Sequence, residues 1–154
     1  MKLSKYFTLA EATRSAKAKA AGIDNTPPPE IIENLRYFLS NFMDKVRDHF
    51  GKPIIANSIY RSPSVNILVG GSKTSFHTQG LAADFTVDGY TPKKAIGEII
   101  RAGIDFDQLI DEFGEWVHLG VRRDKPNRKQ VLVYRRNAYG VSRTAVNIEE
   151  AKRW

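Results

Sequence analysis

The spacing of apolar residues in the first third of the chain predicts two helices. The stretch FTLAEATRSAKAKAAGIDN reads as one helix, in which Thr8 is the N-cap, Glu11 completes a capping box and Gly22 marks the end. Three consecutive prolines then fix the entry to a longer helix that ends at Gly51. The apolar residues of this longer helix recur at helical spacing and are Ile31, Ile32, Leu35, Phe38, Leu39, Phe42, Met43 and Val46.

Apolar and β-branched segments in the remainder of the chain predict a sheet with one inserted helix. KPIIANSIYR, GLAADFTVDG and KQVLVYRR read as strands, and FDQLIDEFGEWVHLGVR reads as two strands joined by a short turn at Phe113-Gly114. TPKKAIGEIIRAGI reads as a third helix, with Thr91 as cap and Pro92 at its first position. SPSVNILVGGSKTS is predicted as a loop, because it contains serines, a proline and a glycine pair.

The order of these elements, helices first and strands afterwards, predicts the α+β class. We expect N-terminal helices packed on a small, mainly antiparallel sheet, in a single domain that covers 1–154. The tail NAYGVSRTAVNIEEAKRW is basic, and its only helical character follows Asn147. The sequence contains no internal repeat and no low-complexity linker.

Composition and charge narrow the kinds of site and partner. The chain has no cysteine, which excludes disulfides and thiolate ligands and leaves imidazole and carboxylate groups to hold zinc. No apolar run predicts a signal peptide or a membrane segment, so we expect synthesis in the cytoplasm without a signal peptide. The net charge of +7 favours an anionic polymer as partner, either nucleic acid or a bacterial cell wall.

Two of the three histidines, together with one aspartate, form a candidate metal site. Asp84 and His118 each interrupt an apolar strand, where a buried polar group needs a partner, and His77 lies seven residues before Asp84. Taken alone, His118 would read as a core histidine bonded to a backbone carbonyl. His49 ends the second helix, where an imidazole suits the helix C-terminus, and this favours a local structural role.

Three short motifs occur together in the central part of the chain. SFHTQGLAAD matches Ser-x-His-x-x-x-Gly-x-Ala-x-Asp with one residue fewer between His77 and Gly80, EWVH matches a later Glu-x-x-His, and SIYRS lies upstream. Between about Leu9 and about Val121 the chain therefore resembles the zinc-dependent D-alanyl-D-alanine peptidases. That family, of the Hedgehog/DD-peptidase fold, includes peptidoglycan carboxypeptidases, vancomycin-resistance dipeptidases and phage endolysins that cut between L-alanine and D-glutamate.

The resemblance implies a catalytic zinc site with three protein ligands. His77, Asp84 and His118 would hold Zn2+ and leave a fourth position for water. Arg61, in SIYRS, corresponds to the arginine that the family uses near the substrate carbonyl or carboxylate. A guanidinium suits that role because it stays charged and can donate two parallel hydrogen bonds.

Four further polar residues are candidates to line or support this site. Ser75 and Gln79 flank His77 and could contact the substrate, and Asn66 could support them. Asp107, in FDQLI, is a candidate partner for a zinc histidine, since such ligands usually donate their other N–H to a carboxylate or carbonyl. For all four residues a structural role is an equal alternative.

Two glutamates compete for the role of general base. Glu115 lies three residues before His118, which is the family spacing, and we prefer it on that ground. Its alternative reading is an exposed turn residue beside Gly114. If the turn takes three residues rather than two, strand register places Glu112 on the face of His118 instead.

Three functions follow from these observations. The leading hypothesis is a zinc metallopeptidase that hydrolyses an amide bond in peptidoglycan peptide stems. We expect a monomer of the phage or prophage endolysin type, which reaches the cell wall through a holin pore or in a virion. The alternative is a catalytically reduced virion or cell-wall-binding module of the same fold. A nucleic-acid-binding domain, suggested by VRRDKPNRK and YRRN, ranks last because no recognition motif accompanies the charge.

Overall fold

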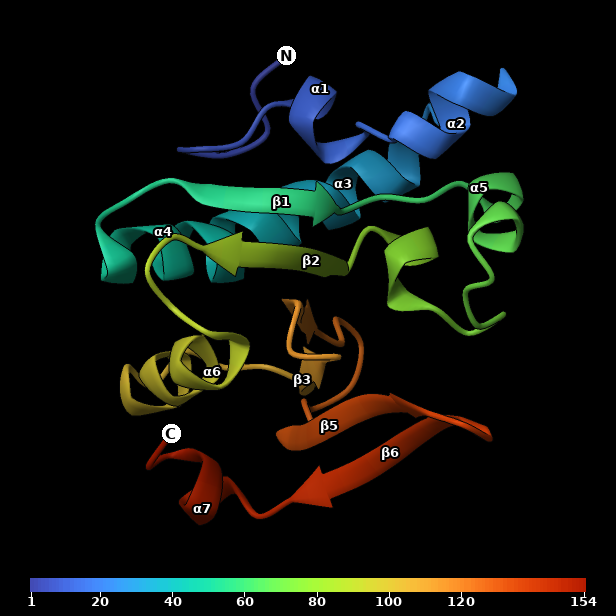
Figure 1. Cartoon of the computed structure of the whole chain (residues 1–154). Helices are drawn as coiled ribbons and strands as arrows, with labels where there is room; N and C mark the ends of the chain where they lie inside the picture. The colour runs from blue at the N-terminus through green and yellow to red at the C-terminus, as the bar shows by residue number, and fades with distance from the viewer.

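A six-stranded sheet in the order β1-β2-β4-β3-β5-β6 runs through the molecule (Figure 1). This computed structural model describes residues 1–154. The strands are β1 (Ile54–Ser58), β2 (Ala82–Val87), β3 (Gln108–Glu112), β4 (Trp116–Gly120), β5 (Gln130–Asn137) and β6 (Gly140–Val146). All neighbours pair antiparallel except β3 and β5, which are parallel. The α+β fold with a mainly antiparallel sheet is therefore confirmed.

Most of the helical segments are short. They are α1 (Leu9–Ala12), α2 (Ala16–Ala21), α3 (Pro29–Phe38), the π-helical turn η1 (Leu39–Met43), α4 (Asp44–Phe50), α5 (Pro63–Leu68), the 3-10 turn η2 (Phe76–Gln79), α6 (Pro92–Arg101) and α7 (Ile148–Ala151). α3, η1 and α4 follow one another without a break and confirm the predicted second helix, and α6 confirms the third. None of the helices combines the length and the apolar character that crossing a bilayer requires.

The core occupies one face of the sheet. The run from α3 to α4 passes behind β1 and β2 in Figure 1, and α6 packs against β2, β3 and β4. A single apolar cluster joins these elements, and its fully buried members include Leu35, Phe38, Leu39, Met43, Phe85, Ile96, Ile99, Leu109 and Leu119. Because side chains alternate along a strand, the neighbours of Phe85 and Leu119, namely Asp84 and His118, face the opposite side.

The first predicted helix is wrong in one respect, because it is divided into α1 and α2. Thr8 caps α1 and Gly22 ends α2, as the sequence predicts. Between them, the Ala12 carbonyl accepts a hydrogen bond of 2.9 Å from the Tyr60 N–H, which ties the end of α1 to the chain that leaves β1. Ser15 then caps a new helix with its own side chain. A tertiary contact and a second cap thus override the local helical propensity.

The segment 62–75, predicted as a loop, contains the helix α5. The Ser62 hydroxyl accepts a hydrogen bond from the Val65 N–H, and Pro63 occupies the first helical position. A Ser-Pro pair is compatible with both a turn and the first residues of a helix, and in this chain it begins a helix. Only the residues after α5, from Gly70 onward, form an irregular connection to η2.

The turn between β3 and β4 takes three residues, Phe113, Gly114 and Glu115, rather than two. Glu112 therefore pairs with Trp116 across the two strands. Opposed residues of an antiparallel pair share a face, and the face alternates with every residue. Glu112 and Trp116 consequently lie on the same side of the sheet as His118, two residues further along β4.

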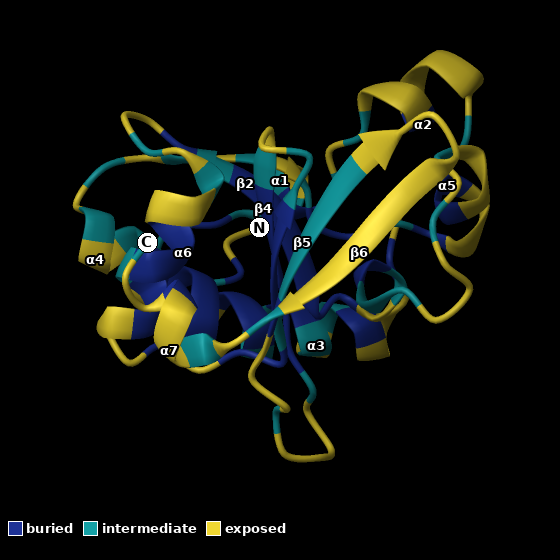
Figure 2. Cartoon of the chain, turned by 60° about the horizontal axis from the view of Figure 1, so that its bottom comes forward, coloured by how far each residue is buried: buried dark blue, intermediate teal, exposed yellow.

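The tail that begins at Asn137 contains a strand, β6, that was not predicted from the sequence. β6 pairs with β5 along its whole length, and the two form a hairpin with Tyr139 at its tip. Most of β6 is exposed, whereas β4 is buried (Figure 2). With little apolar surface to bury, β6 carries only a weak hydrophobic pattern. α7 follows with Asn147 as its cap, in agreement with the sequence.

Candidate metal centre

Two neighbouring strands and one short helix bring three candidate ligands together. Asp84 of β2 pairs directly with His118 of β4, on the face of the sheet opposite the core. His77 comes from η2, which Ser75 caps and Gly80 ends in the left-handed conformation before the chain enters β2. One ligand atom from each of the three residues lies within 4.8 Å of the others. The structure thus assembles the His-Asp-His set that the sequence proposes.

The three side chains are buried and tied to one another through the aspartate. One Asp84 oxygen lies 2.9 Å from His118 Nδ1 and 3.3 Å from His77 Nε2. His77 is 2% exposed, Asp84 5% and His118 9%. His77 Nδ1 donates to the Ile59 carbonyl at 2.7 Å, so its Nε2 carries a free lone pair that faces the cluster.

An atom without a partner shows that this cluster suits a metal ion. His77 Nε2 is fully buried and has no hydrogen-bond partner, which is costly unless another group satisfies it. A divalent cation beside the Asp84 carboxylate would do so. Two imidazoles and a carboxylate are a nitrogen and oxygen donor set that fits zinc. The residues present therefore fit the ion that the sequence implies.

Protonation of the three groups also agrees with metal binding. Burial alone would raise the pKa of Asp84, but the adjacent His77 and His118 outweigh it and hold that pKa far below its usual range. Burial lowers the pKa of His77, which favours the neutral ring. Burial also acts to lower the pKa of His118, but its hydrogen bond to Asp84 reverses this and raises the pKa. Binding of a metal ion would release the proton of His118.

The two candidate general bases occupy different environments. The Glu112 carboxylate lies 3.7 Å from His118 Nδ1 and its side chain is 17% exposed. Burial, with a smaller contribution from the negative charge of Asp84, raises the pKa of Glu112. The Glu115 side chain is 55% exposed and accepts a hydrogen bond of 2.8 Å from Arg136. Of the two carboxylates, only Glu112 lines the groove that leads to the metal centre.

Arg61 is held beside the metal centre by three acceptors. Its Nε donates to Ser58 Oγ at 3.0 Å, and its two terminal nitrogens donate to Asn66 at 3.4 Å and to the second oxygen of Asp84 at 3.0 Å. Gly71, in the connection after α5, packs closely against Asn66. A Cβ on Gly71 would lie 2.0 Å from the Asn66 side-chain oxygen. Arg61 therefore orients Asp84 while it lines the groove.

Of the remaining candidate residues, Ser75 supports the metal centre, whereas Gln79 and Asp107 do not contact it. Ser75 lines the groove, and its hydroxyl accepts a hydrogen bond of 3.2 Å from the His77 N–H. Gln79 does not line the groove, and its carbonyl accepts a hydrogen bond from Asn34 on α3. The prediction that Asp107 supports a zinc histidine is wrong. Its buried carboxylate binds Arg128 at 2.8 Å instead, and the partner of His77 is the Ile59 carbonyl.

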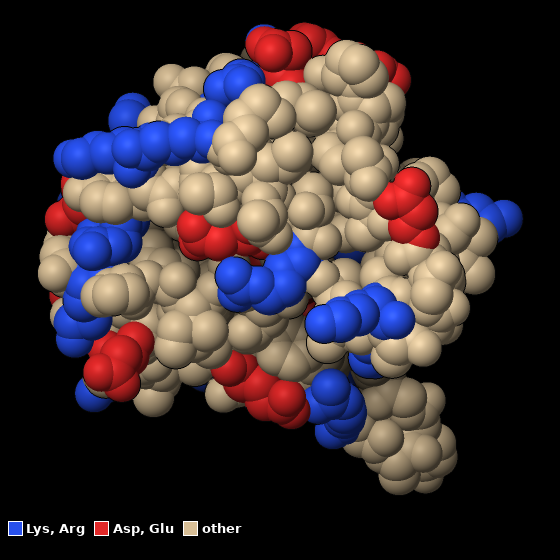
Figure 3. All heavy atoms as spheres, turned by 90° about the horizontal axis from the view of Figure 1, so that it is seen from above, with Lys and Arg blue, Asp and Glu red and all other residues tan.

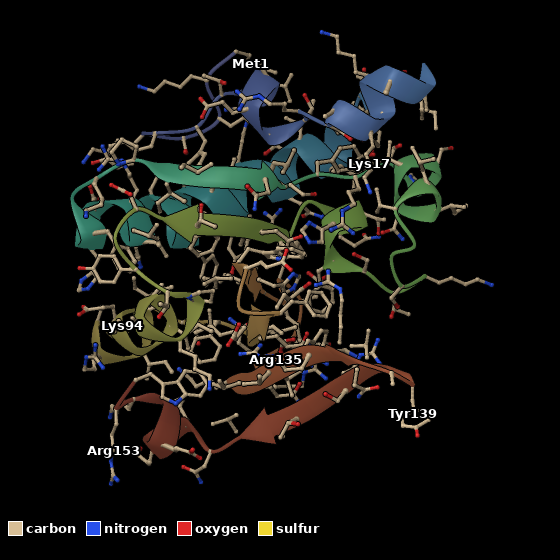
Figure 4. The ribbon with its side chains drawn as sticks, in the orientation of Figure 1. Met1, Lys17, Lys94, Arg135, Tyr139 and Arg153 are labelled. Atoms are coloured by element: carbon tan, nitrogen blue, oxygen red, sulfur yellow. The ribbon has the colours of Figure 1, made fainter.

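The metal centre lies in an open groove of about 1100 Å³. Its walls come from η2 and the connection after α5 on one side, and from the β5–β6 hairpin and the β3–β4 turn on the other. In Figure 4 the hairpin tip, marked by Tyr139, and α2, marked by Lys17, lie at the same end of the molecule. Groove residues that the sequence did not single out include Phe113, Trp116, Tyr134, Arg136, Val141 and Arg143. Alternation along the predicted strand KQVLVYRR is the signal that could have placed Tyr134 and Arg136 on one face, whereas no sequence pattern pointed to Val141 and Arg143.

Comparison with known proteins agrees with this site. No curated protein matches the chain. The sequence model of the family described as Peptidase M15 matches residues 5–120, which include β1 to β4 and all three candidate ligands. The match covers three quarters of the chain and ends before the β5–β6 hairpin. The chain therefore belongs to the peptidase M15 family and is a metallopeptidase of the zinc D-Ala-D-Ala carboxypeptidase type.

Proposed function

We propose that this protein is a zinc metallopeptidase that hydrolyses an amide bond in the peptide stems of bacterial peptidoglycan, as a phage or prophage endolysin does. The observation that carries the proposal is the buried His77-Asp84-His118 cluster with an unpartnered imidazole nitrogen, at the floor of an open groove. His77 Nε2, an Asp84 oxygen and His118 Nδ1 would hold the ion. When bound, zinc lowers the pKa of a coordinated water to about 7 and polarises the scissile carbonyl.

Glu112 is the proposed general base. Its carboxylate faces the centre from β3, within 3.7 Å of His118 Nδ1, and would take a proton from water and deliver it to the leaving amine. A raised pKa suits this double role, because the group must both accept and return the proton near neutral pH. Glu115 has the family spacing, but its carboxylate lies outside the groove and pairs with Arg136.

Arg61 is proposed to act in two ways. Its hydrogen bond to Asp84 fixes the orientation of the carboxylate that would bind the ion. Its side chain is 16% exposed and borders the groove, and its guanidinium would stabilise negative charge on the substrate carbonyl oxygen or carboxylate. Ser75 contributes by fixing the backbone of His77.

The shape and charge of the groove support a cell-wall peptide as substrate. The groove is large enough for several residues of a peptide chain. It is lined by six basic residues, Lys17, Arg61, Arg122, Arg128, Arg136 and Arg143, against the two carboxylates of Asp84 and Glu112. This excess of positive charge would attract the free carboxylates of peptidoglycan stems.

The distribution of charge offers less support for nucleic-acid binding. The face seen in Figure 3 carries lysine and arginine side chains interspersed with acidic ones rather than a continuous basic surface. Arg122 and Arg128, from one of the two basic stretches, bind the buried Asp107. Arg135, from the other, binds the buried Asp111 at 2.8 Å. These arginines therefore form ion pairs within the protein, and this makes them less available to bind the phosphates of a nucleic acid.

Metal content and product analysis test the proposal together. The purified protein is expected to bind about one zinc per chain. A chelator should abolish cleavage of purified peptidoglycan, and added zinc should restore it. Mass spectrometry of the released muropeptides identifies the cleaved bond from its new termini. Cleavage that survives complete metal removal would contradict the mechanism, and zinc binding without any cleavage would favour a reduced cell-wall-binding module.

A further inference from the structure

The β5–β6 hairpin presents one face to the groove. Tyr134 pairs with Arg143, and Arg136 pairs with Val141, so all four side chains lie on the same side of the two strands. All four line the groove. Arg136 and Arg143 are diagonal neighbours across the pair, a relation that places Cβ atoms about 7–8 Å apart. Two guanidinium groups can therefore reach one anionic group.

Aromatic rings support both of these arginines. The Arg136 guanidinium carbon lies 3.7 Å from the centre of the Phe113 ring, and that of Arg143 lies 5.1 Å from the centre of the Tyr134 ring. Phe113 has a φ of 63°, an uncommon conformation for a residue other than glycine. An arginine held against a ring face keeps its in-plane N–H donors free for a carboxylate. The stacking thus prepares both donors before a ligand binds.

These two arginines are also the most available on this wall. The Arg143 side chain has no ion pair and no hydrogen bond within the protein. Arg136 pairs with Glu115, but both side chains are more than half exposed, and such pairs are weak and screened by salt. In contrast, Arg128 and Arg122 bind the fully buried Asp107 and Arg61 binds Asp84.

We propose that Arg136 and Arg143 form a subsite that binds a free carboxylate of the peptide substrate and so makes the enzyme select acidic stem peptides. This inference rests on the proposed peptidase function and adds a specificity determinant to it. The hairpin lies beyond residues 5–120, so this wall is a property of the present chain rather than of the segment shared with the family. The bond is cleaved at the metal centre, and the two arginines only hold the substrate.

Steady-state kinetics on two forms of one substrate test the subsite. Stem peptides released from peptidoglycan are used in free-acid form and after carbodiimide-coupled amidation of their carboxylates. We expect a kcat/KM at least about tenfold higher for the free acids, because a charge-assisted hydrogen bond contributes about one to two powers of ten in affinity. Arg143→Gln should raise KM for the free acids by about tenfold and leave kcat within about twofold.

Two further variants keep this test specific. Arg143→Lys retains the charge but loses the planar fork, so it should fall between wild type and Arg143→Gln. Arg153→Gln removes an exposed arginine from the C-terminal end, far from the hairpin tip in Figure 4, and should leave both KM values unchanged. Thermal melting establishes that each variant is folded. A KM for free acids that is the same in wild type and Arg143→Gln would overturn the subsite.

Failure of the subsite is distinguishable from failure of the proposed function. If wild type cleaves free-acid and amidated peptides equally well, the peptidase function stands and the subsite is rejected. If no peptide is cleaved, the proposed function fails, and calorimetric titration of the same peptides still measures the subsite. In that case a tenfold weaker affinity of Arg143→Gln supports the carboxylate site. Equal affinity, or binding only of phosphate-containing polymers, overturns it.

Discussion

The two walls of the groove differ in burial, in bonding and in their relation to the family. On one wall, His77, Asp84 and Arg61 form a connected set of short polar contacts, largely shielded from solvent. On the other, the β5–β6 hairpin is mostly exposed, and Tyr139 at its tip is completely so. The family match covers the first wall and ends before the β5–β6 hairpin of the second. In our proposal, the chemistry takes place on the buried strands and the exposed hairpin binds the substrate.

This difference has a physical basis. Charges and lone pairs act over short distances at full strength only where water is excluded, so a metal centre requires a buried and rigid support. A recognition surface must instead meet a large substrate, and exposed arginines remain effective there because each can form two hydrogen bonds. Substitutions on the buried wall should therefore have large effects on turnover, whereas those on the hairpin should change mainly KM.

The largest expected effect comes from removing a metal ligand. His77→Ala should reduce the zinc content from about one ion per chain to near zero and abolish peptide hydrolysis, because only two protein ligands would remain. His49→Ala is the matched control, since His49 pairs with Glu98 on the surface and lies outside the groove. Elemental analysis of dialysed protein measures zinc directly. Full zinc occupancy in His77→Ala would contradict the site.

The two glutamates of the β3–β4 hairpin provide the next test. Glu112→Gln should lower kcat by about 10²–10⁴-fold while zinc remains bound, because a positioned base is lost and the ligands are intact. Glu115→Gln should change kcat little, because Glu115 pairs with Arg136 on the surface. Both variants are compared by turnover and zinc content on the same substrate. The reverse order of activity loss would assign the base to Glu115.

Stability should show the same contrast between the two regions. Leu119→Ala removes a fully buried side chain from β4 and should cost about 2–5 kcal/mol in the free energy of unfolding. Val141→Ala changes a residue of β6 that is 41% exposed and should cost no more than about 0.5 kcal/mol. Urea unfolding followed by tryptophan fluorescence measures both. A loss above 2 kcal/mol for Val141→Ala would show that the hairpin is part of the core.

The sequence was most informative where burial is strong. The apolar spacing of α3, α4 and α6 predicted those helices, because each has a buried face. Asp84 and His118 stood out because polar groups in apolar segments need partners, and His77 stood out from its spacing before Asp84. The exposed strand β6 carries no comparable pattern, and without it Arg136 and Arg143 could be read only as positive charge.

The choice between Glu112 and Glu115 depended on a detail that hydrophobic pattern does not specify. One residue more or less in the β3–β4 turn decides which glutamate shares the face of His118. Phe113 supplies the extra turn residue by adopting a positive φ, which sequence propensity disfavours outside glycine, asparagine and aspartate. Tertiary packing of Phe113 against Trp116 and Tyr134 accompanies this conformation.

Asp107 connects the two regions, and its replacement is expected to cost less stability than the replacement of Leu119. Its N–H donates to Gly120 at the end of β4, and its carbonyl accepts from Gln130 at the start of β5. Its buried carboxylate binds the backbone and the side chain of Arg128. Asp107→Asn keeps the size of the side chain but removes the charge, and should lower the free energy of unfolding by about 1–3 kcal/mol at pH 7.

The pH dependence of this loss follows from the pKa of Asp107. Burial alone would raise that pKa, but the hydrogen bonds from Arg128 outweigh burial and lower it. The ionised carboxylate therefore stabilises the fold above the unfolded-state pKa of about 3.9, and the stabilisation disappears as pH falls through the lower folded-state pKa. Wild type and Asp107→Asn should differ most at neutral pH and converge as the pH falls below about 4 in urea unfolding. If the stability curves of wild type and Asp107→Asn remain parallel down to pH 2, the charge of Asp107 does not stabilise the fold through Arg128.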